Sequence, residues 1–121
     1  MEFKKIAEIL GPLLPKGWED VRLYAQLDKS SYEYFFYVKI DGEYIQNFEL
    51  EKLYKISRKE MRSSFKNLYA NMKDFQISDN WKVATFSMDS KGDFKITYDY
   101  DTPTELINIE YKNKWKTKYL K

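Results

Sequence analysis

Carboxylates that could bind a cation or move a proton gather around one stretch of this sequence, Tyr98-Asp99-Tyr100-Asp101. If the stretch is a β-strand with its tyrosines toward a core, both aspartates share the opposite face, because successive side chains alternate between faces. Further acids precede it in a turn and follow it in a helical segment. The predicted acidic patch consists of Asp89, Asp93, Asp99, Asp101 and Glu105.

Three interpretations of this acidic patch stay open at the level of sequence. It could be a solvated face whose last members lie near a helix N-terminus, where negative charge is favourable. It could be a docking surface for a basic partner, or a metal or acid/base site. Pairs such as Asp99 with Glu105, or Asp89 with Asp93, have the residue types of glycoside hydrolysis. Any chain this acidic offers such pairs, so they are not specific.

Composition narrows the chemistry that these acids could perform. The chain has no His and no Cys. It therefore lacks the commonest general base and metal ligand, as well as any thiolate or disulfide chemistry. Its 21 basic and 19 acidic side chains leave a net charge of +2, which demands no nucleic acid as partner. We expect no catalytic residues, no metal and no cofactor.

A second group with potential function is the lysine-rich C-terminal segment. Its aromatic members, Trp115 and Tyr119, are candidate anchors for a partner, since Trp and Tyr are favoured in protein interfaces. Lysines interleaved with aromatic rings can also contact nucleic acid. The simpler interpretation is a helix end, where cations are favourable. The lysines concerned are Lys112, Lys114, Lys116, Lys118 and Lys121.

Hydrophobic periodicity predicts three helices and five strands around these residues. The order is αβββαββα, and short turns between consecutive strands favour antiparallel pairing. The class is therefore α+β, with helices covering an antiparallel sheet of about five strands. A helix is expected over 2–14, with Pro12 ending or distorting its last turn, and another over about 103–119. The helix expected behind Ser57 carries an apolar stripe of Met61, Phe65, Leu68, Tyr69, Met72 and Phe75. Strands are expected over 18–27, 32–41, 43–48, 81–88 and 94–100.

Local signals set several of these boundaries. Residues 32–41 are apolar on both faces, which predicts a strand covered on both sides. Asp41-Gly42 predicts a two-residue hairpin, and 49–56 is expected to be a connection. Ser57 with Glu60, and the segment 102–105 with Pro103 at the first helical position, predict capped helix starts.

Length and the N-terminal residues bear on organisation and location. The 121 residues fit one domain spanning 1–121. No run approaches the roughly 20 apolar residues of a membrane span. Gly11, Pro12 and Pro15 interrupt the first apolar stretch, so no signal-peptide core is expected. We expect a cytoplasmic protein without a membrane partner.

Several blocks of the chain together resemble the YezG-like family of antitoxins, or immunity proteins. The run 81–101 is similar to the family's strand–turn–strand block, with Trp, Thr-Phe-Ser, Gly-x-Phe and Tyr-Asp-Tyr-Asp in order. Residues 13–25 resemble its Pro-x-x-Trp-x-x-Val start to strand one, 34–37 its second strand, and 115–119 its last helix. The chain departs from the pattern at Asn80, where a Pro is expected before the Trp, and in a shorter C-terminal helix.

This resemblance implies a protein that binds another protein rather than an enzyme. The family implies neutralisation of a secreted bacterial toxin, typically one with an LXG-type secretion region and a C-terminal nuclease. We therefore expect a stoichiometric inhibitor of a cognate toxin with a basic surface, and no small-molecule substrate. From the alternation of strand five, and not from the family, we predict that the toxin contacts Asp89, Asp93, Asp99, Asp101, Glu105, Trp115 and Tyr119. The alternatives are a small enzyme using carboxylates and a divalent cation, or a nucleic-acid-binding adaptor.

Overall fold

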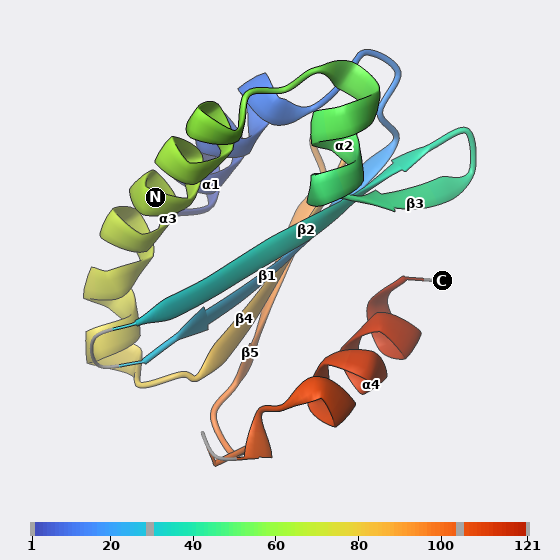
Figure 1. The fold of residues 1–121 in the computed structure, drawn as a ribbon. Helices are drawn as coiled ribbons and strands as arrows, with labels where there is room; N and C mark the ends of the chain where they lie inside the picture. Colours follow the sequence, from blue (N-terminus) through green and yellow to red (C-terminus); the bar gives the residue numbers. More distant parts are fainter. Residues whose placement is uncertain (1, 29–30, 104–105, 121) are drawn as a thin grey trace.

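A computed structural model describes residues 2–28, 31–103 and 106–120, and for 2–3 and 74–79 only the backbone. The described elements are α1 (Glu2–Leu10), a 3-10 turn η1 (Gly11–Leu13), β1 (Asp20–Leu27), β2 (Tyr32–Ile40), β3 (Glu43–Gln46), α2 (Asn47–Tyr54), α3 (Arg58–Asp79), β4 (Val83–Asp89), β5 (Phe94–Asp99) and α4 (Ile109–Tyr119). The sheet lies between α1, α2 and α3 on one side and α4 on the other (Figure 1). The α+β class is confirmed.

The five strands form one antiparallel sheet in the order β3-β2-β1-β4-β5. Each short turn of the chain pairs neighbouring strands, whereas α2 and α3 carry the chain from the β3 edge to the far side of β1. β1 is therefore the middle strand, and β2, expected to be covered on both faces, is an interior strand with five consecutive buried residues. We call the face under α1, α2 and α3 the main face, and the opposite one the α4 face.

The main face carries the larger hydrophobic core. It takes the odd positions of β1 and the even positions of β2 and β4, as the two-residue period of a strand requires. The helices add side chains one turn apart, such as Ile6 and Leu10 of α1 or Leu68 and Met72 of α3, all fully buried. Most of the apolar stripe predicted behind Ser57 contacts this core; Phe75, its last member, has no described side chain.

One predicted helix cap and one predicted helix break agree with the structure. The hydroxyl of Ser57 accepts hydrogen bonds from the backbone N–H groups of Lys59 and Glu60, so it caps α3 as expected. Pro12 ends the regular part of the first helix, since α1 stops at Leu10 and a 3-10 turn follows.

The segment expected to be a strand end and a connection is a helix, α2. β3 stops at Gln46, and the next residue, Asn47, is buried. Its Oδ1 accepts a hydrogen bond of 3.1 Å from the backbone N–H of Phe36, one residue beyond the last pair of the β2–β3 ladder. A side-chain amide thus replaces a strand partner, and the backbone is free to turn into a helix. Leu50 and Asn47 are the buried residues of α2, so its hydrophobic period was too weak to predict it.

The last helix begins later than expected, at Ile109 rather than near residue 103. Thr102 does not cap it, because its hydroxyl donates to the carboxylate of Asp99. Asn108 is the N-cap instead, and its side chain accepts from the N–H of Tyr111. Thr104 and Glu105 of the predicted capping box lie outside the described residues.

Candidate functional site

The α4 face is only partly covered, and this makes it the candidate site. α4 places Tyr111, Trp115 and Tyr119 toward the sheet, because residues four apart share one face of a helix. They contact the part of the face where β1 ends and β2 begins. The rest of the face, toward the β4–β5 turn, remains open to solvent.

Trp115 fixes the middle of α4 and is 4% exposed. Its ring packs edge-on against Tyr24 and Phe35, with centroids 5.5 and 5.4 Å away. Its indole N–H donates a 2.8 Å hydrogen bond to Thr85 Oγ1, which satisfies both buried polar groups. Trp115, predicted as a partner contact, therefore presents almost no surface of its own.

Asp99 holds the start of α4 in place, and among the described acids of the predicted patch it accepts the most hydrogen bonds. Oδ1 accepts from the backbone N–H groups of Asp101 and Thr102, and Oδ2 accepts from the hydroxyls of Thr102 and Tyr111 at 2.8 and 2.7 Å. A carboxylate has about four acceptor positions, so this one is saturated. Burial by itself would raise the pKa of Asp99, but these hydrogen bonds outweigh it and hold the pKa below its ordinary value. Asp99 is therefore a poor proton acceptor, and its role is to hold α4 against the sheet.

The other acids of the predicted patch are placed differently. Asp101 is exposed beyond the end of β5 and lines, with Asp99, a groove of about 350 Å³ between β5 and α4. Asp89 ends β4, and its Oδ1 accepts from the N–H groups of Lys91 and Asp93, which shapes the turn. Asp93 is exposed, and Glu105 lies outside the described residues. The structure thus spreads these acids over both ends of β5 instead of gathering them at one point.

Tyr119 marks the boundary between the covered and open parts of the α4 face. It is half-buried, its ring lies 5.4 Å from that of Trp115, and its hydroxyl lies 3.2 Å from Thr97 Oγ1. Beyond it begins the open part, which we call the open face. Its residues include Asp20, Arg22, Tyr44, Ser87 and Lys95.

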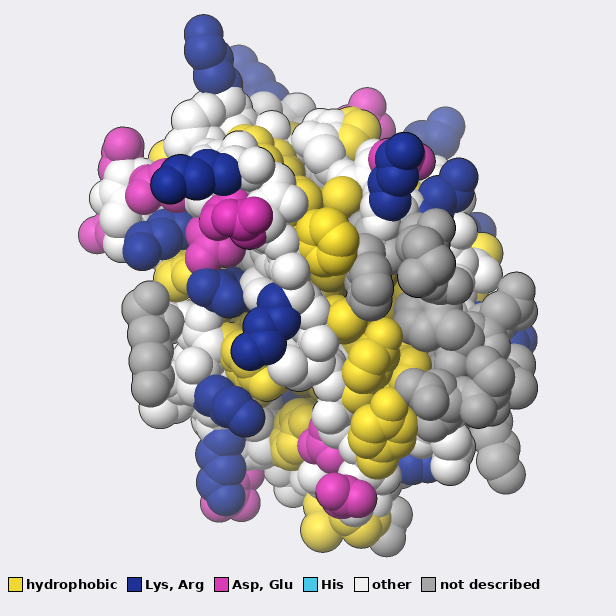
Figure 2. Space-filling model, turned by 180° about the vertical axis from the view of Figure 1, so that it is seen from behind, with side chains coloured by type: hydrophobic (Ala, Val, Ile, Leu, Met, Phe, Trp, Pro, Cys, Tyr) yellow, Lys and Arg dark blue, Asp and Glu magenta, His cyan; other side chains and the backbone are white. Residues whose placement is uncertain are grey.

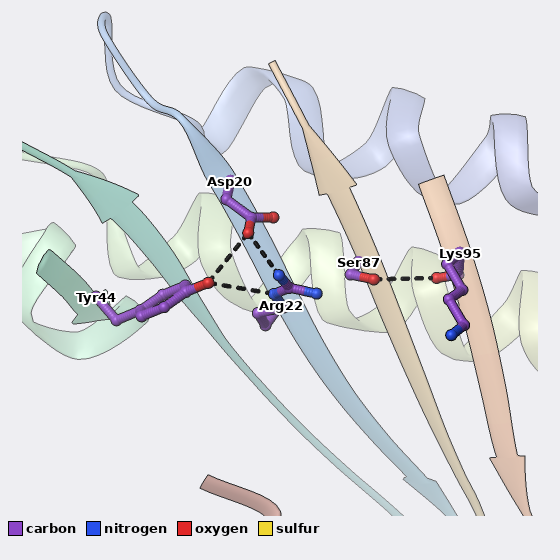
Figure 3. Close-up of polar contacts among 5 residues, drawn as sticks. All are labelled: Asp20, Arg22, Tyr44, Ser87 and Lys95. Atoms are coloured by element: carbon purple, nitrogen blue, oxygen red, sulfur yellow. Dashed lines mark hydrogen bonds and ion pairs between the residues drawn. The ribbon is translucent and has the colours of Figure 1, made fainter. Parts of the chain in front are cut away.

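A fixed arginine lies at the centre of the open face. Arg22 Nη2 contacts Asp20 at 2.7 Å, and its Nε donates to the Tyr44 hydroxyl, which itself donates to the same Asp20 oxygen at 3.0 Å (Figure 3). Burial would lower the pKa of Arg22, but the bond to Tyr44 and the charge of Asp20 raise it overall. Because both its neighbours hold it, the guanidinium keeps one orientation without losing its charge.

Two neighbouring strands extend this arrangement into a row. Arg22 of β1 pairs with Ser87 of β4, and Ser87 pairs with Lys95 of β5, so all three share the open face (Figure 3). The Ser87 hydroxyl donates to the Lys95 carbonyl at 3.5 Å. The small serine leaves a hollow between two cations, and Lys118 of α4 contributes to its wall.

The β5 edge of the molecule exposes hydrophobic surface. Seen from behind the view of Figure 1, hydrophobic side chains form a broken column with lysines or arginines beside it (Figure 2). Phe94 at the start of β5 and Tyr100 just beyond its end are 50% and 46% exposed. Exposed aromatic rings are typical of protein-binding surfaces.

Within the described residues, no group of three or more His, Cys, Asp or Glu converges as a metal ion would require. None of the helices described is long and apolar enough to cross a membrane.

Sequence reasoning missed the open face because its residues come from four strands. The alternation Asp20, Arg22, Tyr24 places the first two on one face of β1. That signal was available, but only the strand order puts Ser87 beside Arg22, and Tyr44 within reach of Asp20 and Arg22. Strand order is not encoded in any local pattern.

Comparison with known proteins matches the chain to immunity proteins. A family model described as immunity protein YezG-like matches residues 2–121. The immunity protein YezG of Bacillus spizizenii is 27% identical over 129 residues, covering 98% of this chain and 80% of that protein. The immunity protein YezG of Bacillus subtilis is also 27% identical, covering 98% of this chain and 85% of that protein.

The chain therefore belongs to the YezG-like family of immunity proteins.

Proposed function

We propose that this protein is an immunity protein that binds a cognate bacterial toxin in the cytoplasm and neutralises it by stoichiometric inhibition. The observation that carries the proposal is the family match over residues 2–121. The relatives named as immunity proteins align with 98% of the chain, so the likeness is not confined to one motif. An inhibitor of this kind needs a surface and no catalytic group.

The architecture supports a binding role over a catalytic one. Asp99, the best-placed carboxylate, is saturated with hydrogen bonds and has a lowered pKa. In contrast, the open face holds charged side chains in fixed positions, which lowers the entropy cost of forming an interface. The β5 edge adds exposed aromatic rings, of which Phe94 lies on the main-face side of the sheet, paired with Met88.

We further propose that the toxin is a nuclease. A nuclease needs a basic surface for its substrate, so exposed acids on an inhibitor would steer association and cover that surface. Among the described members of the predicted acidic patch, Asp93 and Asp101 are exposed. They, with Asp89, Glu105 and Tyr119, remain our predicted contacts.

The test is co-expression of this chain with the toxin domain encoded beside its gene. We expect restored growth and a 1:1 complex by native mass spectrometry. Nuclease activity of the purified toxin domain should fall in proportion to the inhibitor added. Growth that stays arrested, together with no complex, would rule the proposal out; a complex with a toxin that cleaves no nucleic acid would contradict only the nuclease part.

The acidic contacts are tested by Asp93→Lys and Asp101→Lys in the same assay. Both residues are exposed, so the fold should be unaffected. We expect slower association and a weaker dependence of the association rate on salt. The matched control is Glu8→Lys, an exposed acid of α1 on the other side of the sheet. Equal effects at all three positions would refute a specific acidic contact.

A further inference from the structure

The open face contains a hollow of about 270 Å³ between the end of α4 and strands β1, β4 and β5. Its charged lining residues are all cationic: Arg22, Lys95 and Lys118. Its other lining residues all bear hydroxyl groups: Thr85, Ser87, Thr97 and Tyr119. We call it the cationic pocket.

This pocket differs from an ordinary patch of surface lysines because one of its cations is built in. Arg22 comes from the middle strand of the sheet, and its side chain is 28% exposed. Asp20 and Tyr44 bind its Nε and Nη2 from the side away from Lys95 (Figure 3). Among the described residues, no hydrogen bond occupies the remaining Nη1, so the guanidinium can donate into the pocket.

The two lysines leave the pocket with unbalanced positive charge. Within the described part of the chain, neither Lys95 nor Lys118 has an acidic group within 4 Å, whereas Arg22 has Asp20. Arg22 and Lys95 are separated by Ser87 on the strand between them, which puts their backbones roughly 10 Å apart. That spacing lets one carboxylate sit between the two cations, over Ser87.

The charge changes sign within the open face. The adjoining hollow, of about 230 Å³, shares Arg22, Ser87 and Lys95 with the pocket but adds the acids Asp20, Asp89 and Asp93. A partner that covered both hollows would need an acidic group for one and basic groups for the other. We infer that the cationic pocket receives an acidic side chain, Asp or Glu, of the bound toxin. The basic surface of the toxin then meets the aspartates of the β4–β5 turn. This inference rests on the proposed function and names the chemistry of the partner.

The first experiment uses the isolated full chain and a small dicarboxylate as probe. We would titrate ¹⁵N-labelled protein with sodium glutarate, holding ionic strength constant with sodium chloride. We expect saturable shifts at Ser87, Lys95 and the Arg22 Nε–H, and loss of saturation in Lys95→Gln/Lys118→Gln. The control is Lys114→Gln, an exposed lysine of α4 that does not line this pocket.

The second experiment measures toxin binding by Lys95→Glu/Lys118→Glu against wild type and Lys114→Glu. Reversing the charge of two lysines that contact an acid of the toxin should weaken binding by at least about tenfold. Wild-type protein that fails to bind would refute the proposed function itself. Wild-type protein that binds no better than Lys95→Glu/Lys118→Glu would refute only the pocket inference. Inorganic phosphate that saturates the pocket about tenfold more tightly than glutarate would identify a phosphate site and overturn the carboxylate assignment.

Discussion

The helices on the two faces of the sheet are held by different kinds of interaction. On the main face, three helices bury a continuous apolar core that includes Val21, Leu23, Phe36 and Phe86, all fully buried. On the α4 face, one helix is fastened by named polar contacts around a small aromatic cluster. The part of that face toward the β4–β5 turn is left open, with Arg22 held by Asp20 and Tyr44. The comparison indicates that the main face specifies the fold and that the α4 face is available for recognition.

The largest expected effect comes from the main face. Phe36→Ala removes a fully buried ring at the centre of the core and should lower the free energy of unfolding by about 3–5 kcal/mol. A domain of this size has about 5–15 kcal/mol in total, so the variant should be marginal. Urea unfolding followed by circular dichroism measures the change. The control, Phe48→Ala, removes an exposed ring of α2 and should change stability by less than about 0.5 kcal/mol. Equal losses would contradict a core centred on this face.

The next effect tests whether α4 is a separable layer. Trp115→Ala removes the ring that fills the aromatic cluster and should cost up to about 3 kcal/mol, less than Phe36→Ala, because α4 can detach instead of leaving a cavity. Amide hydrogen exchange should accelerate across Ile109–Tyr119 while β1 and β4 stay protected. Acceleration throughout the sheet would show that the two faces unfold together. Trp115→Phe, which keeps a ring but loses the Thr85 bond, should lie between wild type and alanine.

The difference between the faces also explains what the sequence allowed us to predict. The main face follows from periodicity: the stripe from Met61 to Met72 and the alternation of Ala84, Phe86 and Met88 are local signals of burial. The place of Asp99 on the face opposite Tyr98 follows from the same two-residue period.

Features that depend on contacts between distant residues were not predictable. The role of Asn47 depends on where β3 ends beside β2, and the start of α4 depends on Thr102 bonding Asp99 rather than the helix. Asp99 was correctly placed on the face opposite Tyr98, but the hydroxyl that Tyr111 directs at it comes from another element. The sequence pattern placed the negative charge of Asp99 on this face. Only the tertiary structure shows that hydrogen bonds within the chain already fill the acceptor positions of this carboxylate.

A smaller effect, with a pH signature, tests the fastening of α4. Asp99→Asn should cost about 1–2 kcal/mol at pH 7, since it weakens hydrogen bonds to a charged acceptor. The pKa of Asp99 is lower in the folded state than in the unfolded chain. Its stabilisation is therefore complete above the unfolded value, about 4, and is lost as pH falls through the lower folded value. Urea unfolding of both proteins from pH 7 to pH 2.5 should show their difference shrinking at the acid end. A difference independent of pH would mean that the charge of Asp99 is irrelevant to the fastening.

The smallest expected effect on stability distinguishes a tyrosine that holds a helix from one that orients a single side chain. Tyr111 and Tyr44 each donate to an aspartate on the α4 face, but Tyr111 holds α4 and Tyr44 holds only the side chain of Arg22. Tyr111→Phe should lower the free energy of unfolding by about 1 kcal/mol or more, whereas Tyr44→Phe should cost a few tenths, since Asp20 still pairs with Arg22. Toxin binding should reverse this order: Tyr44→Phe frees the guanidinium to move and should weaken binding, while Tyr111→Phe leaves the open face intact. If Tyr44→Phe instead destabilised the fold as much as Tyr111→Phe, the open face would belong to the structural core of the molecule, and the division between the two regions would have to be abandoned.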